Sequence, residues 1–92
     1  MLELNFLNQA EKFLKKLKKS DLQTAKQIVS KILELQEEPS PATSKKIVNH
    51  YPFRRIRVGK YRIVYMYDEK MLYISLVEKR DVVYKELSKY LK

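Results

Sequence analysis

The stretch that decides the fold of this chain is Phe53-Arg-Arg-Ile-Arg-Val-Gly-Lys-Tyr-Arg-Ile-Val-Tyr-Met-Tyr67. Its centre, Gly59-Lys60, separates two runs of alternating residues, and a two-residue loop that begins with glycine is typical of a type II′ β-hairpin. Such a turn fixes the register of the two strands, so Val58 is expected to face Tyr61. Every further pair then follows one residue at a time along the strands.

Alternation of side chains divides this hairpin into two faces. One face is apolar and aromatic and holds Ile56, Val58, Tyr61, Ile63, Tyr65 and Tyr67. The opposite face holds Arg55, Arg57 and Arg62 together with Val64 and Met66. Arg57 and Arg62 lie directly opposite one another, and like charges in that arrangement destabilise a sheet by a few tenths to about 1 kcal/mol. A small protein that keeps this pair is predicted to bind an anion there.

Length and composition indicate one domain over residues 1–92, with a modest core. There is no cysteine, so neither disulfides nor thiolate metal ligands are available. The sequence has no evident signal peptide and no apolar run near about 18 residues, so a cytoplasmic location without a membrane is expected.

The net charge of +9 is unevenly distributed along the chain. Residues 1–44 contain seven Lys and six Asp or Glu, whereas residues 45–92 contain thirteen Lys or Arg and five Asp or Glu. All five arginines lie in the second half, and the guanidinium group matches phosphate oxygens in bidentate pairs. The composition therefore favours a nucleic acid as partner, and the alternative is a solvated surface that only keeps the protein in solution.

Residues 2–6 alternate as a short edge strand, and two helices follow them. Asn8 with Glu11 is the predicted capping pair of the first helix, and Ser20 with Gln23 that of the second. The apolar positions at helical spacing are Ala10, Phe13, Leu14 and Leu17, then Leu22, Ala25, Ile28, Val29, Ile32 and Leu35. So short a connection predicts an antiparallel helical hairpin whose two apolar stripes face the core.

The second helix is predicted to end at Pro39-Ser-Pro41, because proline cannot continue a helix. Residues 39–52 form a polar connection in which Lys45 and Lys46 either extend the basic surface or are merely exposed.

A turn at residues 68–70 is expected to lead into a third strand at residues 71–77. A two-residue loop there would place Leu72, Ile74 and Leu76 on the apolar face, although a longer loop with a bulge is the alternative. Asp81 is the predicted N-cap of a last helix over residues 82–91. Its apolar side is expected to hold Val83, Leu87, Tyr90 and Leu91.

The residues offer no evident metal or catalytic-triad chemistry. The carboxylates show no inward pair, and Ser75 has no histidine placed to activate it. Arginines stabilise the charge that develops on a pentavalent phosphorus, and RNA supplies its own nucleophile, the 2′-hydroxyl. The same basic and aromatic surface equally suits RNA binding without cleavage, with tyrosines stacked on bases.

Two runs resemble the RelE/ParE toxin superfamily of toxin–antitoxin systems. They are Tyr51-Pro-Phe-Arg-Arg-Ile-Arg-Val-Gly-Lys-Tyr-Arg-Ile-Val-Tyr65 and Val77-Glu-Lys-Arg-Asp-Val-Val-Tyr84. The resemblance covers nearly the whole chain, including the lysine-rich helical hairpin and the Pro-Ser break. It implies a small α+β fold: an antiparallel sheet with an N-terminal strand, a helical hairpin packed on one face, a three-stranded meander and a short C-terminal helix.

The RelE branch of this superfamily consists of mRNA interferases, which cleave messenger RNA in the ribosomal A site without a metal or other cofactor. The resemblance implies that Arg55 and Arg57 contact the substrate backbone and stabilise the transition state, and that Arg62 holds the scissile phosphate. It further implies that Arg80 neutralises or protonates the leaving 5′ oxygen and that Tyr84 orients or deprotonates the 2′-hydroxyl. Lys45, Lys46 and Lys79 are expected to add RNA contacts.

This chain departs from the RelE pattern at two points. Two positions that are often lysine in the bacterial enzyme are arginine here, and arginine is a poor proton acceptor. The short spacing between Arg80 and Tyr84 leaves open that Tyr84 faces the core with Leu87 and Leu91.

The resemblance also implies partners, namely the ribosome with its mRNA and a RelB-like antitoxin with an acidic, amphipathic segment. Two other functions stay open. One is a ParE-like, non-enzymatic inhibitor of DNA gyrase, and the other is an inactive relative that binds RNA or antitoxin. ParE-type proteins need no cluster of Arg57, Arg62, Arg80 and Tyr84, so the cluster favours the RelE branch.

Overall fold

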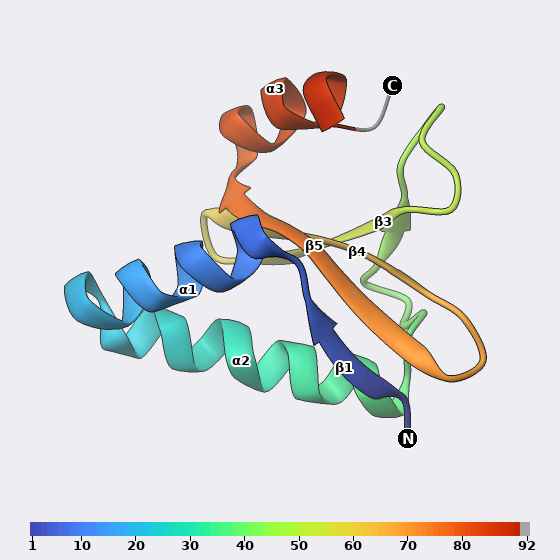
Figure 1. The fold of residues 1–92 in the computed structure, drawn as a ribbon, viewed down its shortest axis with the longest axis horizontal. Helices are drawn as coiled ribbons and strands as arrows, with labels where there is room; N and C mark the ends of the chain where they lie inside the picture. The colour runs from blue at the N-terminus through green and yellow to red at the C-terminus, as the bar shows by residue number, and fades with distance from the viewer. Residues whose placement is uncertain (91–92) are drawn as a thin grey trace.

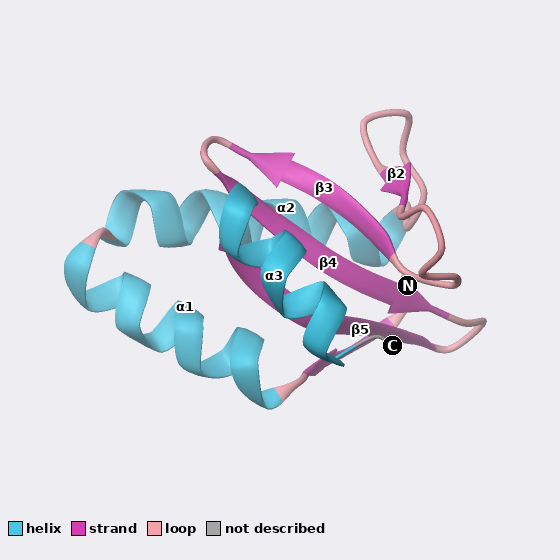
Figure 2. Cartoon of the chain, turned by 90° about the horizontal axis from the view of Figure 1, so that it is seen from above, coloured by secondary structure: helices cyan, strands magenta, loops and turns pink. Residues whose placement is uncertain are grey.

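The computed structural model describes residues 1–90, which form the predicted α+β fold (Figure 1). Its elements in chain order are β1 (Glu3–Phe6), α1 (Asn8–Ser20), α2 (Leu22–Glu37), β2 (Lys45–Lys46), β3 (Arg54–Val58), β4 (Tyr61–Tyr67), β5 (Met71–Lys79) and α3 (Arg80–Tyr90). The five strands form one sheet in the order β1-β5-β4-β3-β2. Figure 2 shows α2 behind this sheet and α3 in front of it. No helix among these residues is long and apolar enough to cross a lipid bilayer.

The hairpin of β3 and β4 has the predicted register. Val58 pairs with Tyr61, and Arg57 pairs with Arg62. Gly59 has a φ of 59°, in the left-handed region that favours glycine, and Lys60 does not share it. This combination matches a type II′ turn.

The hairpin of β4 and β5 keeps the predicted register only as far as Tyr65, which pairs with Ile74. Its two-residue loop is stabilised by Asp68, whose Oδ1 accepts hydrogen bonds from the backbone N–H groups of Lys70 (2.8 Å) and Met71 (2.7 Å). The register shifts by one residue between Tyr65 and Val64. Val64 pairs with Leu76, where an unbroken register would pair it with Ser75.

The prediction that Leu76 joins the apolar face of the hairpin, which packs against α1 and α2, is therefore wrong. Ser75 is the extra residue of a β-bulge, and one extra residue moves every later side chain to the other face. Val77 takes the expected place of Leu76 in the large core. The bulge thus separates the buried residues into two clusters.

The large core fills the space between the sheet and the helical hairpin. Its buried members are Ala10, Leu14, Leu17, Ala25, Ile28, Ile32, Leu35, Ile56, Val58, Tyr61, Ile63, Tyr65, Leu72, Ile74 and Val77. The small core lies on the opposite face, between the sheet and α3, and consists of Ile47, Val64, Leu76 and the α3 residues Val83 and Leu87. Leu22, a predicted core residue, is 52% exposed, because it lies at the first position of α2.

Several local features differ from the predictions. β1 is an edge strand as expected, but it pairs in parallel with β5, so the sheet is mixed rather than wholly antiparallel. The predicted loop of residues 39–52 contains β2, which pairs with β3. The side chain of Tyr90 and the whole of Leu91 lie outside what the structure describes.

The predicted helix caps are also wrong. α1 begins at Asn8 without a side-chain cap. Asp21, rather than Ser20, caps α2 by accepting a hydrogen bond from the backbone N–H of Thr24 (3.1 Å). α3 begins at Arg80, directly after β5, so Asp81 lies within its first turn.

Candidate active site

Four of the five arginines meet in one hollow on the face of the sheet opposite the helical hairpin. This arginine hollow has a volume of about 310 Å³ and is lined by Thr43, Lys45, Arg55, Arg57, Arg62 and Arg80. Strand alternation explains the positions of Arg55, Arg57 and Arg62, because the residues between them point into the large core. Arg80 joins them because β5 runs without a break into α3.

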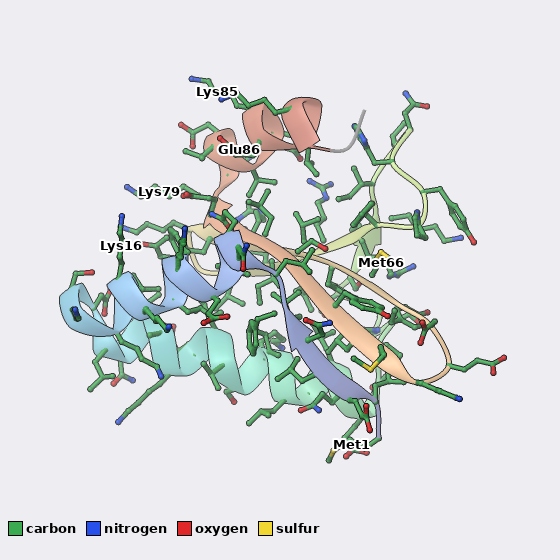
Figure 3. The ribbon with its side chains drawn as sticks, viewed as in Figure 1. Met1, Lys16, Met66, Lys79, Lys85 and Glu86 are labelled. Carbon is green, nitrogen blue, oxygen red and sulfur yellow. The ribbon has the colours of Figure 1, made fainter. Side chains whose placement is uncertain are left out.

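A neighbouring hollow of about 330 Å³ extends the basic surface around the β3–β4 turn. It shares Arg57, Arg62 and Arg80 with the arginine hollow and adds Gly59, Lys60, Lys79 and Asp81. Figure 3 shows the side chain of Lys79 extending outward from the junction of β5 and α3. The predicted contact residue Lys79 thus lies beside the arginines.

Arg57 and Arg62 donate hydrogen bonds to carbonyl oxygens rather than to carboxylates. Arg57 Nε donates to the carbonyl oxygen of Gly59 (3.0 Å), and a guanidinium N–H of Arg62 donates to those of Tyr61 (3.1 Å) and Gly59 (3.5 Å). Within residues 1–90, no arginine forms a salt bridge with an Asp or Glu. Burial, followed by the charges of Arg57 and Arg80, lowers the pKa of Arg62. Such uncompensated positive charge is suited to an anionic ligand.

Glu78 is the cross-strand neighbour of Arg62, yet it is bonded to a different partner. Its carboxylate accepts a hydrogen bond from the side-chain amide of Gln9 (3.3 Å). The same amide group is fixed by the backbone of Val77, donating to its carbonyl oxygen (3.2 Å) and accepting from its N–H (3.0 Å). Gln9 therefore positions the carboxylate of Glu78 opposite Arg62, a role that the sequence alone did not indicate.

Tyr84 faces the arginines and not the core. The phenolic oxygen accepts a hydrogen bond from a guanidinium N–H of Arg55, and the centre of that guanidinium lies 5.9 Å from the centroid of the tyrosine ring. The side chain is 44% exposed, whereas its neighbour Val83 and, one turn on, Leu87 are buried. The alternative of a core-facing Tyr84 is therefore wrong.

The two lysines of β2 differ in position. Lys45 pairs with Arg55 and lines the arginine hollow, as predicted. Lys46 pairs with Arg54 and lies outside that hollow, in two other hollows beside residues 47–53. Thr43 and Lys60 also line the basic hollows, and no pattern in the sequence indicated them.

Arg54 has a structural role on the other face of β3. Its guanidinium donates to the hydroxyl (2.8 Å) and carbonyl (3.3 Å) oxygens of Ser44. The Ser44 hydroxyl is 2.6 Å from the hydroxyl of Tyr65, which donates to the carbonyl oxygen of Pro39 (2.7 Å). Burial raises the pKa of Tyr65. This network fixes residues 39–44 against the sheet.

No group of three His, Asp or Glu within residues 1–90 is arranged to bind a metal ion.

Residues 4–84 match the family model of the ParE toxin of type II toxin–antitoxin systems, parDE. The chain belongs to this family, and the predicted superfamily is confirmed. Comparison with proteins of curated function gave no match.

Solved structures of related toxins have the same fold. A mutant of the Escherichia coli toxin RelE in the free state is 27% identical over 99% of this chain and 98% of its own, with a TM-score of 0.75. The RelE of a RelB–RelE antitoxin–toxin complex from Methanococcus jannaschii is 28% identical over 87% of this chain and 94% of its own, with a TM-score of 0.64. The YoeB dimer from Staphylococcus aureus has a TM-score of 0.76 at 19% identity, over 86% and 97% of the two chains, and so supports the fold alone.

Proposed function

We propose that this toxin is a metal-independent endoribonuclease that cleaves mRNA in the ribosomal A site. The observation behind this proposal is the arginine hollow, which brings Arg57, Arg62 and Arg80 together, with Arg55 bonded to Tyr84 at its side. The likeness to E. coli RelE over almost the full length supports it. Such a reaction takes place in the cytoplasm.

The proposed reaction is an attack by the RNA on itself. The 2′-oxygen loses its proton and bonds to the neighbouring phosphorus, the bond to the 5′ oxygen breaks, and that oxygen gains a proton. The products are a 2′,3′-cyclic phosphate and a 5′-hydroxyl. The protein needs only to align the nucleophile and to stabilise the extra negative charge on the phosphate.

Each residue of the cluster has a proposed role in this reaction. Arg62, the central guanidinium, holds the scissile phosphate, and Arg57 opposite it stabilises the transition state. Arg80, at the start of α3, neutralises or protonates the leaving oxygen. Because the oxygen of Tyr84 accepts a hydrogen bond from Arg55, its own hydrogen remains available to orient the 2′-hydroxyl. Lys45 and Lys79 add contacts to the RNA backbone.

We also propose that an antitoxin holds the protein inactive. RelE from M. jannaschii was solved with RelB, and YoeB from S. aureus with YefM. The corresponding partner here would be RelB-like, with an acidic segment that complements the charge of +8 in residues 45–92. The ribosome and its mRNA would be the other partners.

The second candidate function is inhibition of DNA gyrase, since the matching family is described as ParE toxin. In that case the arginine cluster would not cleave RNA, and the expression of the protein would alter DNA supercoiling while mRNA stays intact. An inactive relative that only binds RNA or antitoxin would cause no growth arrest at all.

The deciding experiment is primer extension on a defined mRNA in a translating extract. Wild-type protein is expected to give new 5′ ends within codons only when ribosomes are present, and Arg62→Ala or Arg80→Ala should slow cleavage by about 10² to 10³-fold. Lys26→Ala, on the exposed surface of α2, is the matched control for the loss of one positive charge. Full cleavage by Arg62→Ala would contradict the catalytic assignment, and an intact mRNA with altered supercoiling would favour gyrase.

A further inference from the structure

Apart from the terminal Met1 (87%), the two most exposed large apolar side chains of residues 1–90 lie in the loop of residues 47–53. Tyr51 is 90% exposed and Val48 is 81% exposed, whereas the other exposed large apolar residues lie between 44% and 53%. Figure 1 shows this loop rising beside β3 on the side of the sheet that carries α3. The arginine hollow lies on that same face.

The loop is nevertheless ordered by its own backbone. Ile47 N–H donates to the carbonyl oxygen of Phe53 (3.1 Å), and Phe53 N–H donates to that of His50 (2.8 Å). Ile47 belongs to the small core, and Phe53 packs against it. The exposed side chains therefore stand on a fixed base, an arrangement typical of a contact surface.

The charge around the loop selects the kind of partner. Residues 39–67 contain seven Lys or Arg and no Asp or Glu. An exposed aromatic ring within so basic a segment suits single-stranded nucleic acid, whose phosphates need cations and whose unpaired bases stack on aromatic side chains.

Two hollows that share lining residues lie between the arginine hollow and Tyr51. A hollow of about 240 Å³ lies between the loop and α3, lined by Val48, His50, Tyr84 and Leu87, and it shares Arg55 with the arginine hollow. It also shares Lys46 and Ile47 with a hollow of about 670 Å³ that Tyr51 lines. A strand with its scissile phosphate among the arginines can therefore follow these hollows to Tyr51.

We propose that the loop of residues 47–53 is a second RNA contact, at which the ring of Tyr51 stacks on an unpaired base of the same strand, further along it than the nucleotides that flank the scissile phosphate. This inference rests on the proposed ribonuclease function and extends it to the positioning of the substrate. Lys46 provides the accompanying phosphate contact. Tyr51 is a positioning residue, because it lies outside the group of side chains that touch the reacting atoms.

The test is the affinity for a fluorescent, fully 2′-O-methylated RNA oligonucleotide, which cannot be cleaved because its nucleophile is blocked. Tyr51→Ala should weaken binding by roughly tenfold to a hundredfold, as expected for the loss of one stacked base. Tyr51→Phe, which keeps the ring, should bind like the wild type, and so should Lys26→Ala. Stacking neutralises no phosphate, so Tyr51→Ala should keep the salt dependence of binding, whereas Arg57→Ala should lower its slope by about 0.7.

The outcomes separate this inference from the proposed function. Equal binding by wild type and Tyr51→Ala would overturn the stacking contact, as would a wild type that does not bind the oligonucleotide. Unchanged RNA binding together with lost antitoxin binding in Tyr51→Ala would assign the loop to a protein partner. The proposed ribonuclease function is tested separately by primer extension. It fails if the wild-type protein cleaves no mRNA there, whatever the RNA affinity of Tyr51→Ala.

Discussion

Ile63 and Arg62 are neighbours in β4, yet Ile63 is fully buried in the large core while Arg62 lies among like charges in an open hollow. The same contrast runs along β3, where Ile56 and Val58 alternate with Arg55 and Arg57. One face of the sheet packs against two helices. On the other face, only Val64 and Leu76 of β4 and β5 are buried in the small core with α3, and the arginines occupy the rest.

The difference shows how a domain of 92 residues keeps an unfavourable group of charges. Repulsion within the arginine hollow lowers stability, and the large core on the opposite face offsets it through apolar burial. Truncation of a core residue and removal of one clustered arginine should therefore have opposite effects on stability.

The largest effect is expected from truncation of the two cores. Ile63→Ala should lower the free energy of unfolding by about 3–5 kcal/mol, because Ile63 is fully enclosed in the large core. Leu76→Ala, in the small core, should cost less, about 2 kcal/mol, and should loosen α3 rather than the whole fold. Urea unfolding gives both values, and amide hydrogen exchange of α3 checks the local effect. If Leu76→Ala speeds exchange in α3 no more than in the rest of the protein, the two cores unfold as one unit.

A smaller effect of opposite sign is expected from Arg57→Ala. Removing one member of the Arg57–Arg62 pair should raise the free energy of unfolding by a few tenths to about 1 kcal/mol at low salt. The gain should fade as salt rises, since at 1 M the Debye length is only about 3 Å. Lys26→Ala is the control and should show no such gain. A destabilised Arg57→Ala protein would show that its bond to Gly59 matters more than the repulsion.

The smallest expected effect is on how stability depends on pH, and it comes from two carboxyl groups outside the arginine hollow, those of Asp21 and Asp68. Hydrogen bonds from the hydroxyl and then the backbone N–H of Thr24 lower the pKa of Asp21. Backbone N–H groups of Lys70 and Met71 lower the pKa of Asp68. A carboxyl whose pKa is lower in the folded state stabilises the fold above its unfolded pKa of about 3.9, and the contribution is lost as the pH falls through the folded value.

The double variant Asp21→Asn, Asp68→Asn should therefore lose less thermal stability between pH 7 and pH 3 than the wild type does. Arg57→Ala should keep the wild-type dependence on pH, since the arginines stay charged throughout. Thermal unfolding of the three proteins at both pH values measures this. An unchanged acid dependence in the double variant would place its origin elsewhere.

The β3–β4 register and its two faces were predictable because Gly59 sets them locally. The shift in β5 was not, because the bulge at Ser75 exists only in the pairing of β5 with β4, and no local pattern marks it. The same reason hid β2, whose two residues are a strand only through their pairing with β3.

The candidate site divides in the same way. Arg55, Arg57 and Arg62 followed from alternation in one hairpin, and Arg80 and Tyr84 came from the resemblance to a toxin family. Thr43 and Gln9 were not predicted, because they reach the site from other parts of the chain.

The carbonyl oxygen of Gly59 accepts hydrogen bonds from both Arg57 and Arg62, the two side chains that repel each other most directly. A shared acceptor restricts the rotamers of two long side chains before any ligand arrives. Less conformational entropy is then lost on binding, so more of the attraction to a phosphate appears as affinity. The only glycine in the chain thus both turns the hairpin and preorganises its arginines.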